Sequence, residues 1–417
     1  MSVVHRGPFI PNCSHDTLLT LEVDGRSLTL NREQSLMLAL FESKNKMVDD
    51  VFRRNFWKTL HPSIKRIPNT YSSKKVASTP CTLERNVEHF KYAIVNSNRV
   101  SLINYKTEYP HLFNGRGDHP LRGSCKYSIH ASDVIINRFN DPGFRLLGYS
   151  KYVDKPEVNW TSCWKDPLTM QWKYVIMSDN NRLVQKFDLA RKLHSKLSSI
   201  RAMNAQNAIS NNIRTQQLAL ATFFIYSLGI RIGNEKDHSI ESETVGCCSL
   251  RKHEHVTIQN KAKQTIHLSF LGKDSILFER TLKLPSVYWK IIESSFNDKK
   301  TKILFHVINP TSLNNYLNSL FPMATAKVFR TCIASSLFQK TLRDTNNMLL
   351  ANKNVAEFCN HKRKSQSGYK LNLITSRSNY IDPRIYFAYI QLHPNTRRSG
   401  WFIEHKHWAD RFPGYKF

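Results

Sequence analysis

The chain has 417 residues, of which 61 are Lys or Arg and 32 are Asp or Glu, so its formal net charge is +29. This length suits two or three domains, and 41% hydrophobic residues with only 14 glycines exclude a disordered or fibrous chain. The basic excess predicts an anionic partner, most simply a nucleic acid, although a ribosomal-type or membrane-surface protein would share it.

Export, membrane and metal signals are weak in this sequence. The segment Met1 to Pro11 lacks the long apolar stretch of a secretory signal. The most apolar segment, Leu218 to Ile230, is too short to span a bilayer. The eight cysteines form no C-x-x-C pair, which argues against a zinc site and against a disulfide scaffold. We therefore expect a reducing compartment and no membrane.

Residues 1–110 show no clear periodicity and are expected to be irregular. Within them, Val51 to Lys58 mixes aromatic and basic side chains, which favours either nucleic-acid contact or a helix with a solvated face. The stretch Gly115 to Pro120, Gly-Arg-Gly-Asp-His-Pro, predicts tight turns in which backbone and guanidinium can approach a phosphate. An adhesion role for its Arg-Gly-Asp would need a secretion signal, which the sequence does not show.

The middle of the chain predicts strands followed by helices. Residues 123–180 are expected to form short strands and turns, with Trp160 and Trp164 in the core. A long helix is predicted from Val184 onward, because apolar residues recur there at helical spacing: Phe187, Ala190, Leu193, Leu197 and Ile200. On its other face, Asp188 and Lys192 are expected to pair. A second helix, from Ile213 to Leu228, is expected to end near Gly229.

Residues 265–282 alternate as a strand pair. Ile266, Leu268 and Phe270 share one face, and the turn at 271–274 is expected to present Lys273 outward. Residues 311–350 again predict helices, and the tail after them is aromatic and basic.

Five residues form a constellation when they are read with their neighbours. Arg231 ends a helix, Lys273 stands on the hairpin tip, and Arg330 lies in Lys-Val-Phe-Arg-Thr. His361 stands before Lys and Arg, and Tyr380 lies in Asn-Tyr-Ile-Asp-Pro-Arg. Each residue alone has an ordinary interpretation as a helix cap, a solvated cation or a packed ring. Their order and local contexts together are more informative than any one of them.

The ordered blocks resemble the eukaryotic-type DNA topoisomerase I family, type IB. The resemblance covers nearly the whole chain and rests on these segments: His5 to Pro8, Phe52 to Phe56, Gly115 to Pro120, Asp133 to Asn137, Arg231 to Leu250, Phe270 to Ser275, Thr325 to Thr331 and Asn379 to Arg384. Several blocks in one order are more specific than a single short motif.

The resemblance implies a chemical role for each member of the constellation. Tyr380 would attack a DNA phosphodiester and form a 3′-phosphotyrosine link. Arg231, Arg330 and His361 would bind the phosphoryl oxygens, and Lys273 would protonate the departing 5′ oxygen. Relaxation of supercoiled duplex DNA would follow, without ATP, an obligatory metal or another cofactor.

The resemblance also implies further DNA-binding residues, namely Arg116, His119, Asp274, Lys327 and Asn379. Three of them, Arg116, Asp274 and Asn379, match positions where camptothecin-class inhibitors bind in the family. Each has a simpler interpretation: Arg116 would contact the DNA backbone, Asp274 would stabilise the hairpin turn, and Asn379 would form a local cap.

For the fold, the resemblance implies an α+β, two-lobed DNA clamp. A mixed α/β cap is expected over residues 1–180, and a mainly helical, tyrosine-recombinase-like catalytic domain over 181–365. A C-terminal segment, 366–417, would carry the nucleophile. The resemblance further implies a monomer that binds double-stranded DNA in the nucleus.

The sequence departs from the family in three ways. It is expected to be a compact form without the long charged N-terminal extension, and only 18 residues separate His361 from Tyr380, too few for the family's helical linker. In addition, Cys332-Ile333 replaces Tyr-Asn, and Ser378 stands where leucine is usual. We expect these replacements to alter packing and leave the chemistry intact.

Two other functions fit part of this pattern. A tyrosine recombinase or integrase shares the nucleophile, but such enzymes usually have His where this chain has Lys327 in Lys-x-x-Arg. A catalytically inactive basic DNA- or RNA-binding protein would explain the charge, but all five catalytic positions are filled. Supercoil relaxation without metal or ATP separates the three interpretations.

Overall fold

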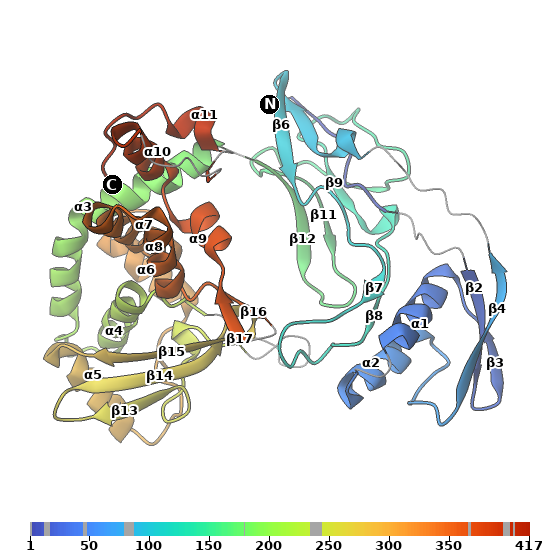
Figure 1. The fold of residues 1–417 in the computed structure, drawn as a ribbon, viewed down its shortest axis with the longest axis horizontal. Helices are drawn as coiled ribbons and strands as arrows, with labels where there is room; N and C mark the ends of the chain where they lie inside the picture. Colours follow the sequence, from blue (N-terminus) through green and yellow to red (C-terminus); the bar gives the residue numbers. More distant parts are fainter. Residues whose placement is uncertain are drawn as a thin grey trace. The chain divides into compact units, whose positions relative to one another are not determined.

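The computed structural model describes most of the chain, and its helices and sheets make this an α+β protein (Figure 1). The described residues are 2–11, 17–44, 48–78, 87–178, 180–233, 244–365, 368–394, 401–402 and 405–417. They fall into two compact units, with the described residues up to Asn180 in the first and those from Asn181 onward in the second.

A seven-stranded sheet forms one part of the first unit. Its order is β1 (Val3–Val4), β5 (Tyr92–Val95), β6 (Asn98–Ile103), β12 (Trp172–Met177), β11 (Trp160–Lys165), β9 (Ile135–Asn137) and β10 (Lys151–Val153). Neighbouring strands are antiparallel, except for the parallel pair β9 and β10. Ile136, Trp164 and Val175 belong to its core, while Trp160 is half-buried. The expected strands in 123–180 are therefore confirmed.

A smaller sheet and two helices form another part of the first unit. The sheet order is β3 (Arg26–Thr29), β2 (Thr17–Val23) and β4 (Tyr71–Ser78), and the helices are α1 (Arg32–Lys44) and α2 (Asp50–Leu60). Asp49 caps α2 by accepting a hydrogen bond from the backbone N–H of Phe52 at 2.9 Å. The rings of Phe41 and Phe56 stack between α1 and α2, with centroids 3.8 Å apart.

These elements correct the expectation that residues 1–110 are irregular. They also show how the basic and aromatic run in α2 is placed. Its aromatic side chains Phe52, Phe56 and Trp57 are buried in the core, as in a helix with a solvated face, and a nucleic-acid contact by its basic side chains stays a prediction. The remaining short elements of the unit are η2 (Glu88–Phe90), β7 (His111–Leu112), β8 (Cys125–Lys126) and η3 (Ala131–Asp133).

Helices dominate the second unit. They are α3 (Asn180–Asn207), α4 (Ile213–Leu228), η4 (Cys247–Ser249), α5 (Ser286–Asn297), α6 (Pro310–Leu320), α7 (Ala326–Thr345), α8 (Met348–Phe358), α9 (Leu373–Tyr380), α10 (Pro383–Leu392) and α11 (Lys406–Ala409). The predicted long helix is α3, and its apolar stripe from Phe187 to Ile200 is buried as expected. The second predicted helix is α4, and it ends at Gly229. Both predictions are confirmed.

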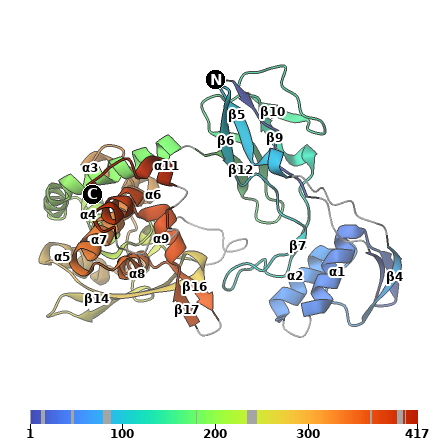
Figure 2. The ribbon, with the colours of Figure 1, turned by 45° about the horizontal axis from the view of Figure 1, so that its top comes forward.

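The strands of the second unit form a three-stranded sheet and a hairpin. The sheet has the order β13 (Val256–Asn260), β14 (Thr265–Gly272) and β15 (Ile276–Lys283), and η5 (Lys273–Ser275) forms the tip between its last two strands. This confirms the strand pair predicted over 265–282, with the turn slightly later than expected. The hairpin of β16 (Lys362–Ser365) and β17 (Gly368–Leu371) leads into α9, and both views show it below that helix (Figure 2).

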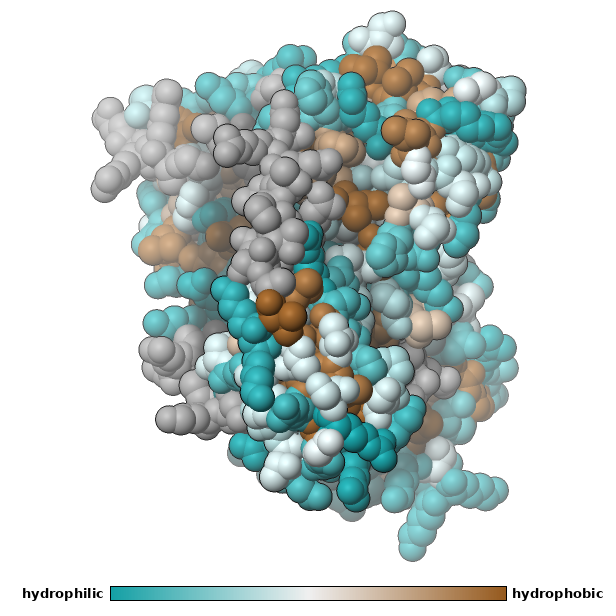
Figure 3. Space-filling view, turned by 90° about the vertical axis from the view of Figure 1, so that its right-hand side faces the viewer, coloured by the Kyte–Doolittle hydropathy of each residue, from teal (hydrophilic) through white to brown (hydrophobic). Residues whose placement is uncertain are grey.

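The described residues on one face of the molecule are mostly polar. Figure 3 shows hydrophilic residues over most of one face, with hydrophobic ones in scattered patches. None of the helices in the described ranges is long and apolar enough to cross a bilayer. The six cysteines that the structure describes are all free thiols.

Candidate active site

A short hydrogen bond joins Arg330 of α7 to Tyr380, the last residue of α9. The Arg330 guanidinium donates a hydrogen bond to the Tyr380 hydroxyl at 2.7 Å and lies over the tyrosine ring, 4.7 Å from its centroid. The same guanidinium donates to the carbonyls of Gly229 at 2.8 Å and Cys359 at 3.2 Å. Both side chains are about 95% buried, so the positively charged Arg330 guanidinium is held against the Tyr380 hydroxyl oxygen.

Gly229 explains how α4 ends close to this arginine. Its φ of +65° is left-handed, which a glycine adopts at little cost. A Cβ at this position would lie 2.7 Å from the carbonyl oxygen of Phe358. The helix therefore ends against α8, with the Gly229 carbonyl available to Arg330.

Arg231 lies three residues beyond α4, so it follows the helix rather than ending it. Its carbonyl accepts a hydrogen bond from the N–H of Cys247 at 2.7 Å, and the N–H of Val245 donates to the carbonyl of Leu271 at 2.7 Å. This pairing ties the Arg231 segment to the hairpin of β14 and β15. Burial, and then the charge of Arg330, lower the pKa of the Arg231 guanidinium. Arg231 and Arg330 therefore place two positive charges close together, which favours binding of an anion.

Lys273 and Asp274 form the exposed hairpin tip, as the alternation of the sequence predicts. Asp274 has φ +69° and Ser275 has φ +53°, a left-handed turn that returns the chain into β15. Arg231, Lys273, Asp274 and His361 all line one pocket. Arg231, Lys273 and His361, which come from separate parts of the sequence, therefore line the same pocket.

His361 is held between α8 and α9. Its N–H donates to the carbonyl of Ala356 at 2.7 Å, and its carbonyl accepts from the N–H of Asn372 at 2.6 Å. Its Nδ1 lies 2.8 Å from Ser376 Oγ, and its ring centroid is 5.0 Å from that of Tyr380. Burial first, and then the charges of Arg330, Arg231 and Lys273, lower the pKa of His361 to about 3. The imidazole is therefore neutral at neutral pH.

Lys327 and Asn379 are exposed, and both are associated with a lysine that sequence reasoning missed. Lys186 of α3 donates a hydrogen bond to the Asn379 carbonyl at 3.0 Å, next to Tyr380. Burial, and then the charge of Lys327, lower the pKa of Lys186 to about 8, against the opposing effect of Asp382. The only sequence signal for Lys186 was its place beside the buried stripe of α3.

Arg116 and His119 belong to the first unit, in the loop between β7 and β8. Arg116 is exposed. His119 Nδ1 accepts a hydrogen bond from the N–H of Leu121 at 3.1 Å, and its ring packs edge-on against Phe113. The structure thus gathers the eight predicted site residues of the second unit in one region and holds these two in the other unit.

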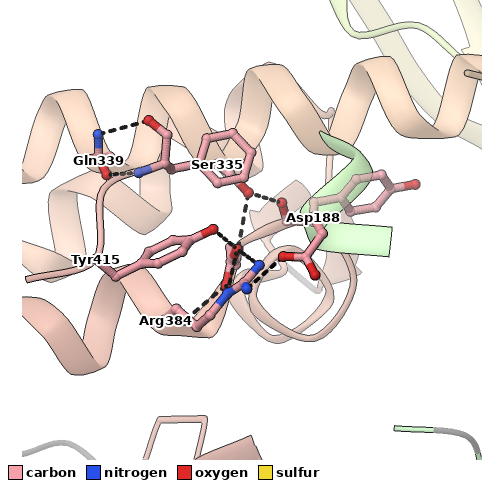
Figure 4. Close-up of polar contacts among 8 residues, drawn as sticks. Asp188, Ser335, Gln339, Arg384 and Tyr415 are labelled. Carbon is pink, nitrogen blue, oxygen red and sulfur yellow. Dashed lines mark hydrogen bonds and ion pairs between the residues drawn. The ribbon is translucent and has the colours of Figure 1, made fainter. Parts of the chain in front are cut away.

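A polar cluster is hydrogen-bonded to the backbone of Tyr380 through Ser335, and Figure 4 shows Ser335 with Asp188, Arg384 and Tyr415. Ser335 Oγ donates to the Tyr380 carbonyl at 2.9 Å and accepts from the N–H of Asp382 at 3.0 Å. The fully buried Asp382 carboxylate accepts from Arg384 at 2.8 Å and from the Tyr415 hydroxyl at 2.9 Å. Arg384 also pairs with Asp188 at 2.7 Å. Asp188 therefore pairs with Arg384, and the expected pair with Lys192 is wrong.

Phe417 packs on the same helix, α7, that carries Ser335 of this cluster. The backbone N–H of Phe417 donates to Gln339 Oε1 of α7 at 2.7 Å, and the Phe417 ring packs near His194 of α3. Figure 4 shows Gln339 and Ser335 on one helix, with Tyr415 and Arg384 below them. The C-terminal residues therefore pack on the helices that hold the tyrosine.

Two family models match this chain. The model of the eukaryotic DNA topoisomerase I catalytic core matches residues 177–381, and the model of the DNA binding fragment of the same enzyme matches residues 70–177.

Among similar proteins, mitochondrial DNA topoisomerase I of Rattus norvegicus is 34% identical over 312 residues, 67% of this chain and 51% of the rat protein. DNA topoisomerase 1 alpha of Arabidopsis thaliana is 28% identical over 427 residues, 90% of this chain and 46% of the plant protein. The chain spans about half the length of these relatives. The two models together cover about three quarters of the chain, which therefore belongs to the eukaryotic DNA topoisomerase I family.

Proposed function

We propose that the chain is a type IB DNA topoisomerase that relaxes supercoiled duplex DNA by transient cleavage of one strand. The observation that carries this proposal is the Tyr380 hydroxyl, which accepts a hydrogen bond from the buried Arg330 beside a pocket lined by Arg231, Lys273 and His361. A tyrosine nucleophile needs cations that stabilise its phenolate, and a phosphodiester needs donors for the charge that develops on its oxygens.

In the proposed reaction, the Tyr380 oxygen attacks phosphorus and loses its proton to the solvent. A bond from the tyrosine oxygen to phosphorus forms as the bond from phosphorus to the 5′ oxygen breaks. Arg231 and Arg330 bind the non-bridging oxygens through paired N–H donors, and His361 donates a further hydrogen bond. Lys273 supplies the proton that the departing 5′ oxygen requires. The phosphotyrosine ester has an energy comparable to the bond broken, so reversal restores the strand without ATP.

The remaining expectations extend this proposal. Residues 1–180 would form the cap of a two-lobed clamp, with Arg116 and His119 as DNA contacts, and residues 181–365 a tyrosine-recombinase-like catalytic domain. Residues 366–417 would deliver Tyr380, while Asp274, Lys327 and Asn379 would contact the DNA near the cleaved bond. The enzyme would act as a monomer in the nucleus, with camptothecin-class compounds as inhibitors at the cleaved site. The family and the +29 charge support this extension.

The test is relaxation of a supercoiled plasmid by the purified chain, with EDTA present and ATP absent. Wild-type protein should relax the plasmid, and Tyr380→Phe should not, while it still binds duplex DNA. The Phe variant keeps the ring and loses only the hydroxyl. Relaxation by Tyr380→Phe would refute the nucleophile, and complete loss of relaxation with EDTA would point to a metal-dependent nuclease.

A further inference from the structure

His361 is bonded at one ring nitrogen and left open at the other. Nδ1 lies 2.8 Å from Ser376 Oγ, and both side chains are buried. Nε2 is also buried, and within the described part of the chain it has no hydrogen-bond partner. Since His361 lines the pocket with Arg231 and Lys273, Nε2 is the ring atom left for a ligand.

The hydrogen positions around this pair can be derived by accounting for donors and acceptors. A neutral imidazole has one N–H and one accepting nitrogen. If the Ser376 hydroxyl donates to Nδ1, the ring proton is on Nε2, and this N–H is the single group left unpaired.

The opposite arrangement leaves two groups unpaired. If Nδ1–H donated to Ser376 Oγ, the Nε2 lone pair would face no donor. The serine hydrogen would also lack an acceptor, because among the described residues His361 is the one hydrogen-bond partner of Ser376 Oγ. Unpaired polar groups are costly when buried, so the first arrangement is favoured.

We propose that Ser376 is a positioning residue that fixes His361 in the Nε2–H tautomer, so that a neutral imidazole donates a hydrogen bond to a phosphoryl oxygen in the pocket. The hydrogen bond at one ring nitrogen determines the proton at the other. This inference rests on the proposed function only for the identity of the acceptor.

The placement of Ser376 also couples the donor to the nucleophile. Ser376 lies four residues before Tyr380 on α9, so both side chains face the same side of the helix. The His361 ring contacts both of them, through Nδ1 at one and ring to ring at the other. One helix therefore determines where the imidazole donates and where the hydroxyl attacks. Since Arg231, Arg330 and Lys273 already supply positive charge, a neutral donor adds a directed hydrogen bond without further repulsion.

The kinetic test uses single-turnover cleavage of a duplex oligonucleotide that traps the covalent product. Ser376→Ala should slow cleavage about tenfold, the loss of roughly one hydrogen bond, and Ser376→Thr should restore most of the rate. Ser378→Ala is the matched control, because it makes the same change on the same helix at a residue without a proposed role, and its rate should stay at the wild-type value. Equal damage by Ala and Thr, or no damage by Ala, would overturn the proposal.

A spectroscopic test reads the tautomer directly. Nitrogen NMR of protein labelled at histidine distinguishes protonated from unprotonated ring nitrogens, and the signal lost in His361→Gln assigns the residue. At pH 7 the wild type should show a protonated Nε2, and Ser376→Ala should gain the Nδ1–H form. A protonated Nδ1 in the wild type, or an unchanged tautomer in Ser376→Ala, would refute the proposal. This readout needs no DNA, so it separates failure of this inference from failure of the proposed function.

Discussion

Lys273 differs from the other proposed catalytic residues because it stands exposed on the hairpin tip. As the proposed general acid, it should matter only when the leaving oxygen needs a proton. We expect Lys273→Ala to slow cleavage of ordinary DNA at least a hundredfold, the usual size of general acid catalysis. On DNA with a 5′-bridging sulfur the loss should be far smaller, because a thiolate leaves unprotonated.

Arg231→Ala provides the control for this experiment. Arg231 is proposed to serve the non-bridging oxygens, so sulfur at the bridging position should not rescue its loss. The rates are measured by single-turnover cleavage of the two substrates by each variant. A Lys273→Ala variant that is equally slow on both substrates would exclude the lysine as the acid.

The low pKa of His361 predicts how stability depends on pH. The unfolded histidine binds a proton below about pH 6.5, but the folded residue stays neutral down to about pH 3. Its contribution to stability is therefore complete above pH 6.5 and is lost as pH falls toward 3. Between pH 7 and pH 5, the free energy of unfolding should fall by about 1–2 kcal/mol more in the wild type than in His361→Gln.

Urea unfolding of both proteins at the two pH values measures this difference. His5, whose pKa burial lowers to about 4, is present in both proteins and cancels in the comparison. An identical loss of stability in the two proteins would show that His361 binds its proton equally in the folded and unfolded chain.

At the scale of residues, the sequence predicted the candidate catalytic side chains. It did not predict the residues that contact and position them. Arg330 and Tyr380 were predicted as site residues because their local motifs resemble a known family, and the structure brings the two side chains into contact. No local motif marks Ser335, Ser376 or Lys186 in the sequence, because their contacts are made with residues of other segments of the chain. A side chain that acts through tertiary contacts leaves no local pattern.

At the scale of elements, Asp382 and Arg384 at the start of α10 join the tyrosine helix to the C-terminal residues. Arg384→Met would leave the fully buried Asp382 without its guanidinium, and we expect a loss of about 3–5 kcal/mol in the free energy of unfolding. Tyr415→Phe removes one hydroxyl donor from the same carboxylate and should cost only about 1 kcal/mol.

Denaturant unfolding with both variants tests this ranking. Phe412→Leu serves as a control, because Phe412 lies over the same guanidinium but is partly exposed and has no polar group for Asp382. Equal losses in Arg384→Met and Tyr415→Phe would contradict a carboxylate that depends mainly on Arg384.

Predictability at this scale depended on how local each element is. The apolar periodicity of α3 and α4 and the alternation of β14 and β15 each lie within one continuous segment of the chain. These elements were therefore predicted. Within residues 1–110, by contrast, β2 also pairs with β4, about 50 residues further on. Strands that pair over such a distance are specified by their partners as well as by their own alternation. This is why residues 1–110 were wrongly expected to be irregular.

At the scale of the whole molecule, the +29 charge predicts how DNA binding depends on salt. Each phosphate that a protein cation neutralises releases counterions, so the logarithm of the binding constant should fall with the logarithm of salt by about 0.9 per phosphate contacted. Several contacts should give a steep slope, and Tyr380→Phe should keep it, because the hydroxyl carries no charge.

Lys327 allows this slope to be assigned to a residue. It is exposed at the first turn of α7, near Lys186, and we propose that it contacts a phosphate. Lys327→Ala should reduce the slope by about 1, whereas Lys290→Ala, which removes the same charge from an exposed position on α5, should leave it unchanged. The slopes come from fluorescence anisotropy of a labelled duplex titrated between low and moderate salt. Equal reductions by both variants would mean that net charge alone determines affinity, and a wild-type slope near zero would refute a phosphate-based interface altogether.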